Sequence, residues 1–97
     1  MQYNPQPQQK QVQLKASEDV LKGRYSNMAQ IAHAKEEFIL DFMCMMPPQA
    51  QLVSRIVLSP GHAKRMMRAL QENIEKYEGA FGKIEEAAAP KEIGFQG

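Results

Sequence analysis

The stretch that decides the fold of this 97-residue chain is residues 52–65, Leu-Val-Ser-Arg-Ile-Val-Leu-Ser-Pro-Gly-His-Ala-Lys-Arg. Its first half is rich in β-branched residues, which favour a strand. Ser59 then suits the N-cap of a helix. Pro60 fits the first helical position, because its missing N–H would have no partner there. The stretch therefore predicts a strand over 52–58 that passes directly into a helix.

The helix is predicted to run from Pro60 to Phe81, and Gly82 suits the left-handed position that follows many helices. At roughly 100° per residue, an arc of about 100° collects the large apolar side chains of this segment. The members of this apolar stripe are Ala63, Met66, Met67, Leu70, Ile74, Tyr77 and Phe81. A helix of this length spans roughly 33 Å, which matches a nine-residue strand, so we expect it to pack along a sheet.

Three further strands are predicted upstream from apolar alternation and β-branched or aromatic content. They cover residues 11–16, 25–33 and 38–46. The last of these ends at Pro47-Pro48, because proline cannot continue a strand ladder. The predicted fold class is therefore α+β. A four-stranded antiparallel sheet is followed by one long C-terminal helix, forming a single ββββα domain over residues 11–84.

The two ends are predicted to be flexible. Residues 1–10 are rich in glutamine and proline and have too little apolar surface to offset the entropy of ordering. Residues 85–97 also read as a flexible tail. Ile93 and Phe95 are the only sizeable apolar groups in that tail, and they are interpreted either as a docking motif or as part of an untethered end.

The composition is that of an ordinary globular domain, with 43% hydrophobic and 24% charged residues. A net charge of +1 indicates no bulk attraction to nucleic acid or membrane. The single cysteine, Cys44, cannot form an internal disulfide. Neither a signal peptide nor an apolar run long enough to span a bilayer is evident, so we expect a cytoplasmic protein without a membrane partner.

The strand over 38–46 is apolar on both faces, which is typical of strands buried on both sides. One helix can cover only one face of the predicted sheet, so the other face would expose an apolar patch. The members of this patch are Ile39, Met43, Met45, Val53 and Val57. Such patches normally mark interfaces, and a homodimer is the simplest explanation. A larger protein partner and scattered surface hydrophobics are the alternatives.

The sequence lacks the motifs that carry common chemistry. His33 and His62 lie far apart in the sequence, and the single cysteine, Cys44, lies between them. This spacing resembles no zinc site. There is no glycine-rich phosphate loop and no nucleophile elbow. We therefore predict that the protein is not an enzyme and that it uses no metal and no cofactor.

The order of charges on the helix opposes the helix macrodipole. Basic residues (Lys64, Arg65 and Arg68) occupy the first half and acidic residues (Glu72, Glu75 and Glu78) the second. Together with Arg55, the three basic residues are candidates for binding phosphate or an acidic partner, and a solvated helix face is the alternative. Arg24 and Tyr25 form a basic-aromatic cluster of the kind that binds single-stranded nucleic acid.

Four motifs resemble those of a small bacterial family of unknown function. They are Gly-Arg-Tyr-Ser-Asn at 23–27, Glu-Phe-Ile-Leu-Asp-Phe at 37–42, the block at 54–65, and Glu-Asn-Ile at 72–74 with Tyr-Glu at 77–78 and Phe-Gly at 81–82. Genes of that family lie beside those for the large RNA polymerase subunits in some bacteria. The resemblance therefore implies an accessory subunit or binding partner of RNA polymerase. The order of strands, Ser-Pro and long helix is also similar to the single-stranded-DNA-binding transcriptional coactivator fold. That similarity implies the alternative of a homodimeric protein that binds single-stranded nucleic acid.

Overall fold

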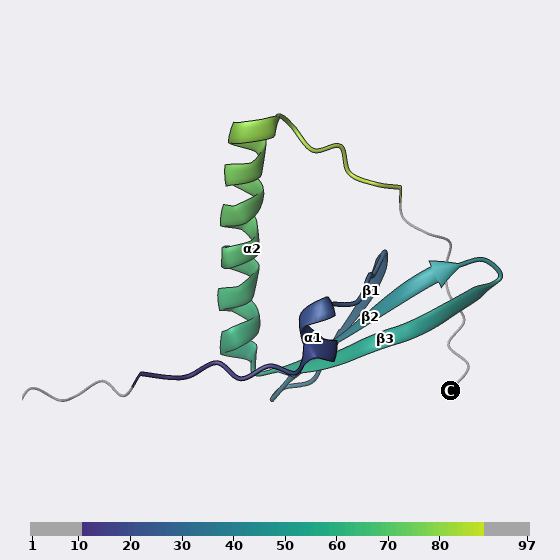
Figure 1. The fold of residues 1–97 in the computed structure, drawn as a ribbon, viewed down its shortest axis with the longest axis vertical. Coiled ribbons are helices and arrows are strands. Elements are labelled where there is room, and N and C mark those ends of the chain that lie inside the picture. Colours follow the sequence, from purple (N-terminus) through teal and green to yellow (C-terminus); the bar gives the residue numbers. More distant parts are fainter. Residues whose placement is uncertain (1–10, 89–97) are drawn as a thin grey trace, which may run out of the picture.

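The computed structural model describes residues 11–88, which form one short helix, three strands and one long helix (Figure 1). The elements are α1 (Glu18–Lys22), β1 (Met28–His33), β2 (Phe38–Met46), β3 (Gln49–Leu58) and α2 (Pro60–Phe81). The predicted arm at 1–10 and the apolar tail residues Ile93 and Phe95 lie outside the described residues. The predicted α+β class with a C-terminal helix is confirmed.

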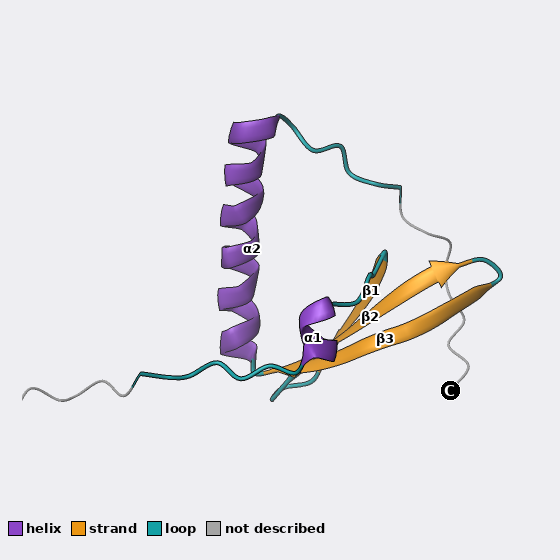
Figure 2. Cartoon of the chain, viewed as in Figure 1, coloured by secondary structure: helices purple, strands orange, loops and turns teal. Residues whose placement is uncertain are grey.

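The three strands form one antiparallel sheet in the order β1-β2-β3, with the most apolar strand in the middle (Figure 2). Phe38 lies opposite His33 on one side and Leu58 on the other. The two-residue link Pro47-Pro48 joins β2 to β3 through a cis peptide bond. The strand predicted over 38–46 is therefore confirmed, and proline ends it as expected.

The predicted first strand, residues 11–16, is wrong. This segment is extended but pairs with no other strand, and Val12 and Leu14 are exposed. The residues that follow it instead form α1, where the Ser17 hydroxyl accepts a hydrogen bond from the Val20 N–H at 3.3 Å. Glu18 and Asp19 occupy the first turn, where they complement the helix dipole. The sheet consequently has three strands in the described residues.

A β-bulge in β3 changes which side chains share a face of the sheet. Phe42 is opposite Ser54 and Met43 is opposite Leu52, so Val53 is the extra residue between them. Because directly opposite residues point to the same face, Leu52 lies on the face of Met43. Strict alternation along 52–58 would have placed it on the opposite face.

The core of the described chain is small and centred on β2. Its buried apolar side chains are Leu40, Met43 and Leu58. Met43 is only 2% exposed. This corrects the expectation that Met43 belongs to an exposed interface patch, because its side chain is already covered within a single chain.

The bounds and caps of α2 are as predicted. The Ser59 hydroxyl accepts a hydrogen bond from the His62 N–H at 3.2 Å, with Pro60 at the first helical position. At the other end, Gly82 adopts a φ of 100° and its N–H donates to the Glu78 carbonyl at 3.0 Å. These local interactions explain why the helix begins and ends at these residues.

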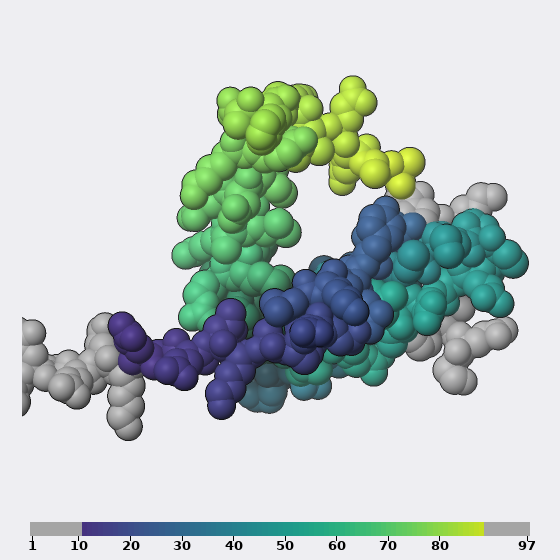
Figure 3. Space-filling view, viewed as in Figure 1, coloured from purple at the N-terminus to yellow at the C-terminus, as the bar shows by residue number. Residues whose placement is uncertain are grey.

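The expectation that the helix packs along the sheet is wrong. α2 projects away from the end of β3, and none of its residues is buried (Figures 1 and 3). The Cα radius of gyration is 19.3 Å, whereas a compact domain of this length has about 12–13 Å. The apolar stripe of α2 is therefore left uncovered by the chain that carries it.

Candidate interaction surfaces

The apolar stripe of α2 is uncovered along the described length of the helix. Leu70 is 59% exposed and Phe81 is 77% exposed. The rings of Tyr77 and Phe81 contact each other with centroids 5.0 Å apart, which continues the stripe into the last turn. A contiguous apolar surface of this kind on a small protein normally marks an interaction site.

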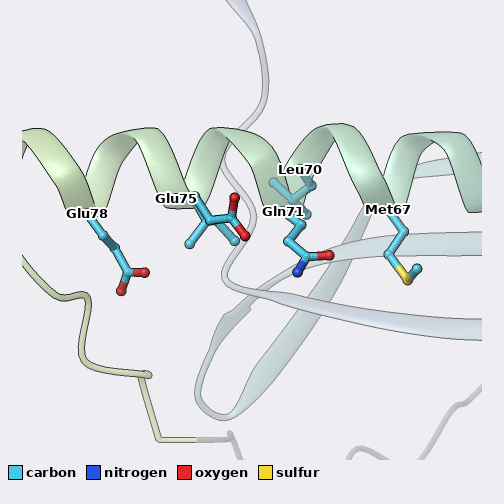
Figure 4. A pocket seen from close by; sticks show the side chains of 6 residues that line it. Met67, Leu70, Gln71, Glu75 and Glu78 are labelled. Atoms are coloured by element: carbon cyan, nitrogen blue, oxygen red, sulfur yellow. The ribbon is translucent and has the colours of Figure 1, made fainter.

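An open groove of about 420 Å³ runs along the same side of α2. Figure 4 shows the side chains of Met67, Gln71, Glu75 and Glu78 projecting from one side of the helix toward it. Leu70 and Ile74 complete its lining. The groove thus combines an apolar floor with carboxylates toward the C-terminal half of the helix.

The sheet carries the second candidate surface. Ile39 lies directly opposite Val57, and Met45 lies opposite Ala50 at the other end of β2. Val57 is exposed, whereas Ile39, Met45 and the bulged Val53 are half-buried. The structure therefore places the predicted patch residues on or beside one face, but the patch is smaller than expected because Met43 is buried.

Arg55 belongs to an ion pair in the sheet. Its Nε and Nη2 atoms donate to the two carboxylate oxygens of Asp41 at 2.7 and 2.9 Å. These hydrogen bonds hold the pKa of the Asp41 carboxyl below its usual range, against the opposing effect of burial. The strand pairing accounts for this ion pair, because it sets Asp41 directly opposite Arg55. Each of the two is the only charged residue of its strand.

The other predicted basic residues lie on the first half of α2. The Arg65 guanidinium lies 2.9 Å from the His62 ring nitrogen Nδ1, one turn away on the same helix. From the helical period, Lys64 and Arg68 lie on the flank of α2 that also carries Glu75 and Glu78. The contacts of the described residues join Arg55 to Asp41 and do not link it to these helical side chains.

Arg24 and Tyr25 lie between α1 and β1. The Arg24 guanidinium contacts the Asp19 carboxylate at 3.1 Å in an exposed ion pair, and Tyr25 is 74% exposed.

The next two residues, Ser26 and Asn27, anchor the start of β1 to β2. Ser26 donates to the Met43 carbonyl, and the Asn27 side chain bonds to both the N–H and the carbonyl of Met45. Sequence reasoning treated Asn27 as a strand residue and missed this anchoring role.

Within residues 11–88, no cluster of three or more histidine, cysteine, aspartate or glutamate side chains is placed to hold a metal ion. No helix in this part of the chain has the length and apolar character needed to cross a membrane.

The fold and these surfaces define a small α+β protein, built from a three-stranded antiparallel sheet and a projecting amphipathic C-terminal helix. A family model described as "Protein of unknown function (DUF3467)" matches residues 1–86, and the chain belongs to this family. The match confirms the resemblance to an uncharacterised family. Comparisons with curated proteins and with solved structures gave no match.

Proposed function

We propose that this protein acts by binding, without catalysis, as a small accessory partner of bacterial RNA polymerase in the cytoplasm. The observation that carries the binding role is the uncovered apolar stripe of α2. A helix in a protein gains most of its stability by packing its apolar face against other residues. An exposed apolar stripe of this length therefore indicates a surface that a partner covers. The resemblance to a family encoded beside RNA polymerase genes directs the proposal to a transcription complex.

The basic residues of α2 supply the second part of this proposal. Lys64, Arg65 and Arg68 lie on an exposed helix, where their charges oppose the macrodipole and weaken the helix slightly. An acidic surface or phosphate group on the partner would compensate for that cost. We therefore assign these three side chains to the contact with the transcription complex.

The test is copurification of the tagged full chain with RNA polymerase after nuclease treatment. The expected result is polymerase subunits in the eluate, and a strong loss of them when Lys64, Arg65 and Arg68 are all replaced by glutamine. A matched control replaces Lys15, Lys22 and Lys35 by glutamine, which removes the same charge elsewhere. Absence of polymerase from the wild-type eluate would refute the proposal, and equal loss in both triple variants would refute the assignment of the helix residues.

The second candidate is a homodimer that binds single-stranded nucleic acid, and the exposed Tyr25 beside Arg24 favours it. A base stacked on a tyrosine contributes about 1–3 kcal/mol. Tyr25→Ala should therefore weaken binding of a single-stranded oligonucleotide at least fivefold, whereas Tyr25→Phe should retain it. The affinity for the oligonucleotide should also fall steeply as the salt concentration rises from about 50 to 200 mM, because contacts to several phosphates release bound counterions. Wild-type affinity in Tyr25→Ala would exclude this surface.

A further inference from the structure

We propose that α2 pairs with α2 of a second copy in an antiparallel two-helix coiled coil. This inference rests on the homodimer of the second candidate function. In such a dimer the two apolar stripes cover each other and Lys64 belongs to the helix pair, so polymerase binding by the dimer would use Arg65 and Arg68, which point away from the seam. It places the dimer interface on the helix, not on the sheet patch that the sequence suggested. Three features of the described residues carry it: the spacing of the stripe, the order of charges beside it, and the uncovered area.

The spacing of the stripe is that of a heptad repeat. The intervals between its central members are four, three, four, three and four residues, which is the pattern of a coiled-coil seam. These members are Ala63, Met67, Leu70, Ile74, Tyr77 and Phe81. The repeat runs from Ala63 to the last residue of α2, Phe81, and none of its positions holds a proline or a charged residue. An amphipathic helix packing on a globular core needs no such strict period.

Antiparallel alignment matches the sizes of the side chains across the seam. With the two-fold axis near residue 72, Leu70 meets the partner's Ile74, and Met67 meets the partner's Tyr77. Ala63, the smallest member, meets the partner's Phe81, one of the largest. Parallel alignment would set Ala63 against Ala63 and Phe81 against Phe81, which leaves a gap at one end and crowding at the other. Cores are destabilised by both defects.

The charges beside the seam favour the same direction. The helical period places Lys64, Gln71 and Glu78 on one flank of the stripe. In an antiparallel pair this flank meets its own copy, so Lys64 lies beside the partner's Glu78 and Gln71 beside the partner's Gln71. The basic first half of each helix then faces the acidic second half of the other. This pairing accounts for a charge order that is unfavourable in an isolated helix.

The available space and area are sufficient for such a pair. The open groove along α2 lies on this face and is lined by Met67, Leu70 and Ile74 together with Gln71 of the charged flank. From their exposed fractions, the apolar side chains of α2 and Ile84 expose on the order of 700 Å² per chain, hence roughly 1,400 Å² for two copies. Stable interfaces bury about 1,200–2,000 Å² in total, so the stripe together with Ile84 reaches the lower part of this range when the two copies cover each other fully.

The first test is the mass of the full chain in solution by sedimentation equilibrium. One chain has a mass of 11.0 kDa, and the proposal predicts a species of twice that mass at micromolar concentration. Leu70→Asp should abolish it by placing two carboxylates in the centre of the seam. Ala69→Asp is the matched control, because it adds the same charge to an exposed neighbouring position off the stripe. A wild-type monomer, or equal dimerisation by both variants, would overturn the proposal.

The second test reads the direction of pairing by charge exchange. Lys64→Glu and Glu78→Lys should each raise the dimer dissociation constant about tenfold, since each sets like charges together at both ends of the pair. The double variant should recover the wild-type value, and an equimolar mixture of the two single variants should form heterodimers. Glu78 also accepts a hydrogen bond from the Ile84 N–H at 3.0 Å, so a purely structural effect of its loss would persist in the double variant. If neither the double variant nor the equimolar mixture restored dimerisation, the antiparallel arrangement would be overturned.

The two proposals fail separately. A protein that is monomeric but still copurifies with RNA polymerase would overturn the helix pairing alone. A dimer sensitive to Leu70→Asp that retains no polymerase would support the helix pairing and refute the polymerase proposal.

Discussion

Met43 offers the sharpest test of how this small sheet is stabilised. Its side chain is 2% exposed in the centre of β2, and Met43→Ala removes the Cγ, Sδ and Cε atoms. At about 0.8 kcal/mol for each buried group of methylene size, the lost transfer free energy is roughly 2.4 kcal/mol. The residual cavity adds to this, so we expect a loss of about 3 kcal/mol in the free energy of unfolding. That is a large fraction of the stability of a domain with three buried apolar side chains.

Urea unfolding followed by circular dichroism measures this loss, at one fixed protein concentration because association also contributes to apparent stability. Met46→Ala is the matched control, since Met46 lies in the same strand and is 72% exposed. Its expected effect is within about 0.5 kcal/mol. Equal losses in the two variants would refute the assignment of Met43 to the core. Met43→Asp should unfold the sheet, whereas a residue of an exposed dimer patch would change only the state of association.

Three further predictions concern local interactions and can be checked by the same unfolding measurement. Ser59→Ala should cost about 1 kcal/mol by removing the acceptor for the His62 N–H, and a loss of only a few tenths would mean that the cap is unimportant. Gly82→Ala should cost about 1–3 kcal/mol because φ there is 100°, whereas Gly79→Ala, inside α2 with open space around it, should stabilise the helix by up to about 1 kcal/mol. The hydrogen bonds from Arg55 lower the folded-state pKa of Asp41, so the stability from this pair is present above the unfolded-state pKa of about 3.9 and is lost as the pH falls through the folded value. The wild type should therefore lose stability more steeply below about pH 4 than Asp41→Asn does, and parallel pH profiles would contradict the role of the pair.

The parts of the fold that sequence reasoning predicted correctly are those with local causes. α2 begins after Ser59 and ends before Gly82 because a hydroxyl acceptor, a proline at the first position and a left-handed glycine act within one turn of each end. β2 ends at Met46, directly before Pro47, because proline lacks the N–H that a ladder requires. None of these interactions depends on a distant part of the chain.

The errors arose where local signals were weak or were given the wrong meaning. The alternation at 11–16 was read as a strand, although an apolar alternation forms one only where another edge is available to pair with it. The strand prediction also overlooked the helix signal that follows, in which Ser17 is the cap and Glu18 and Asp19 form an acidic first turn. The pairing of Arg55 with Asp41 was also missed, because the charge of Arg55 was considered without the register that sets the two residues opposite each other.

The sequence by itself determined the class of the fold, the limits of α2, and the presence of an apolar stripe along that helix. Only the tertiary structure decided where that stripe lies relative to the sheet. The similar lengths of α2 and the strands would allow the helix to pack along the sheet. Whether it does so depends on the direction that the chain takes after Leu58 and on which face of the sheet is left uncovered. The bulge at Val53 likewise decided which side chains of β3 share a face with Met43. Burial and pairing of this kind are properties of two segments together, so neither segment specifies them alone.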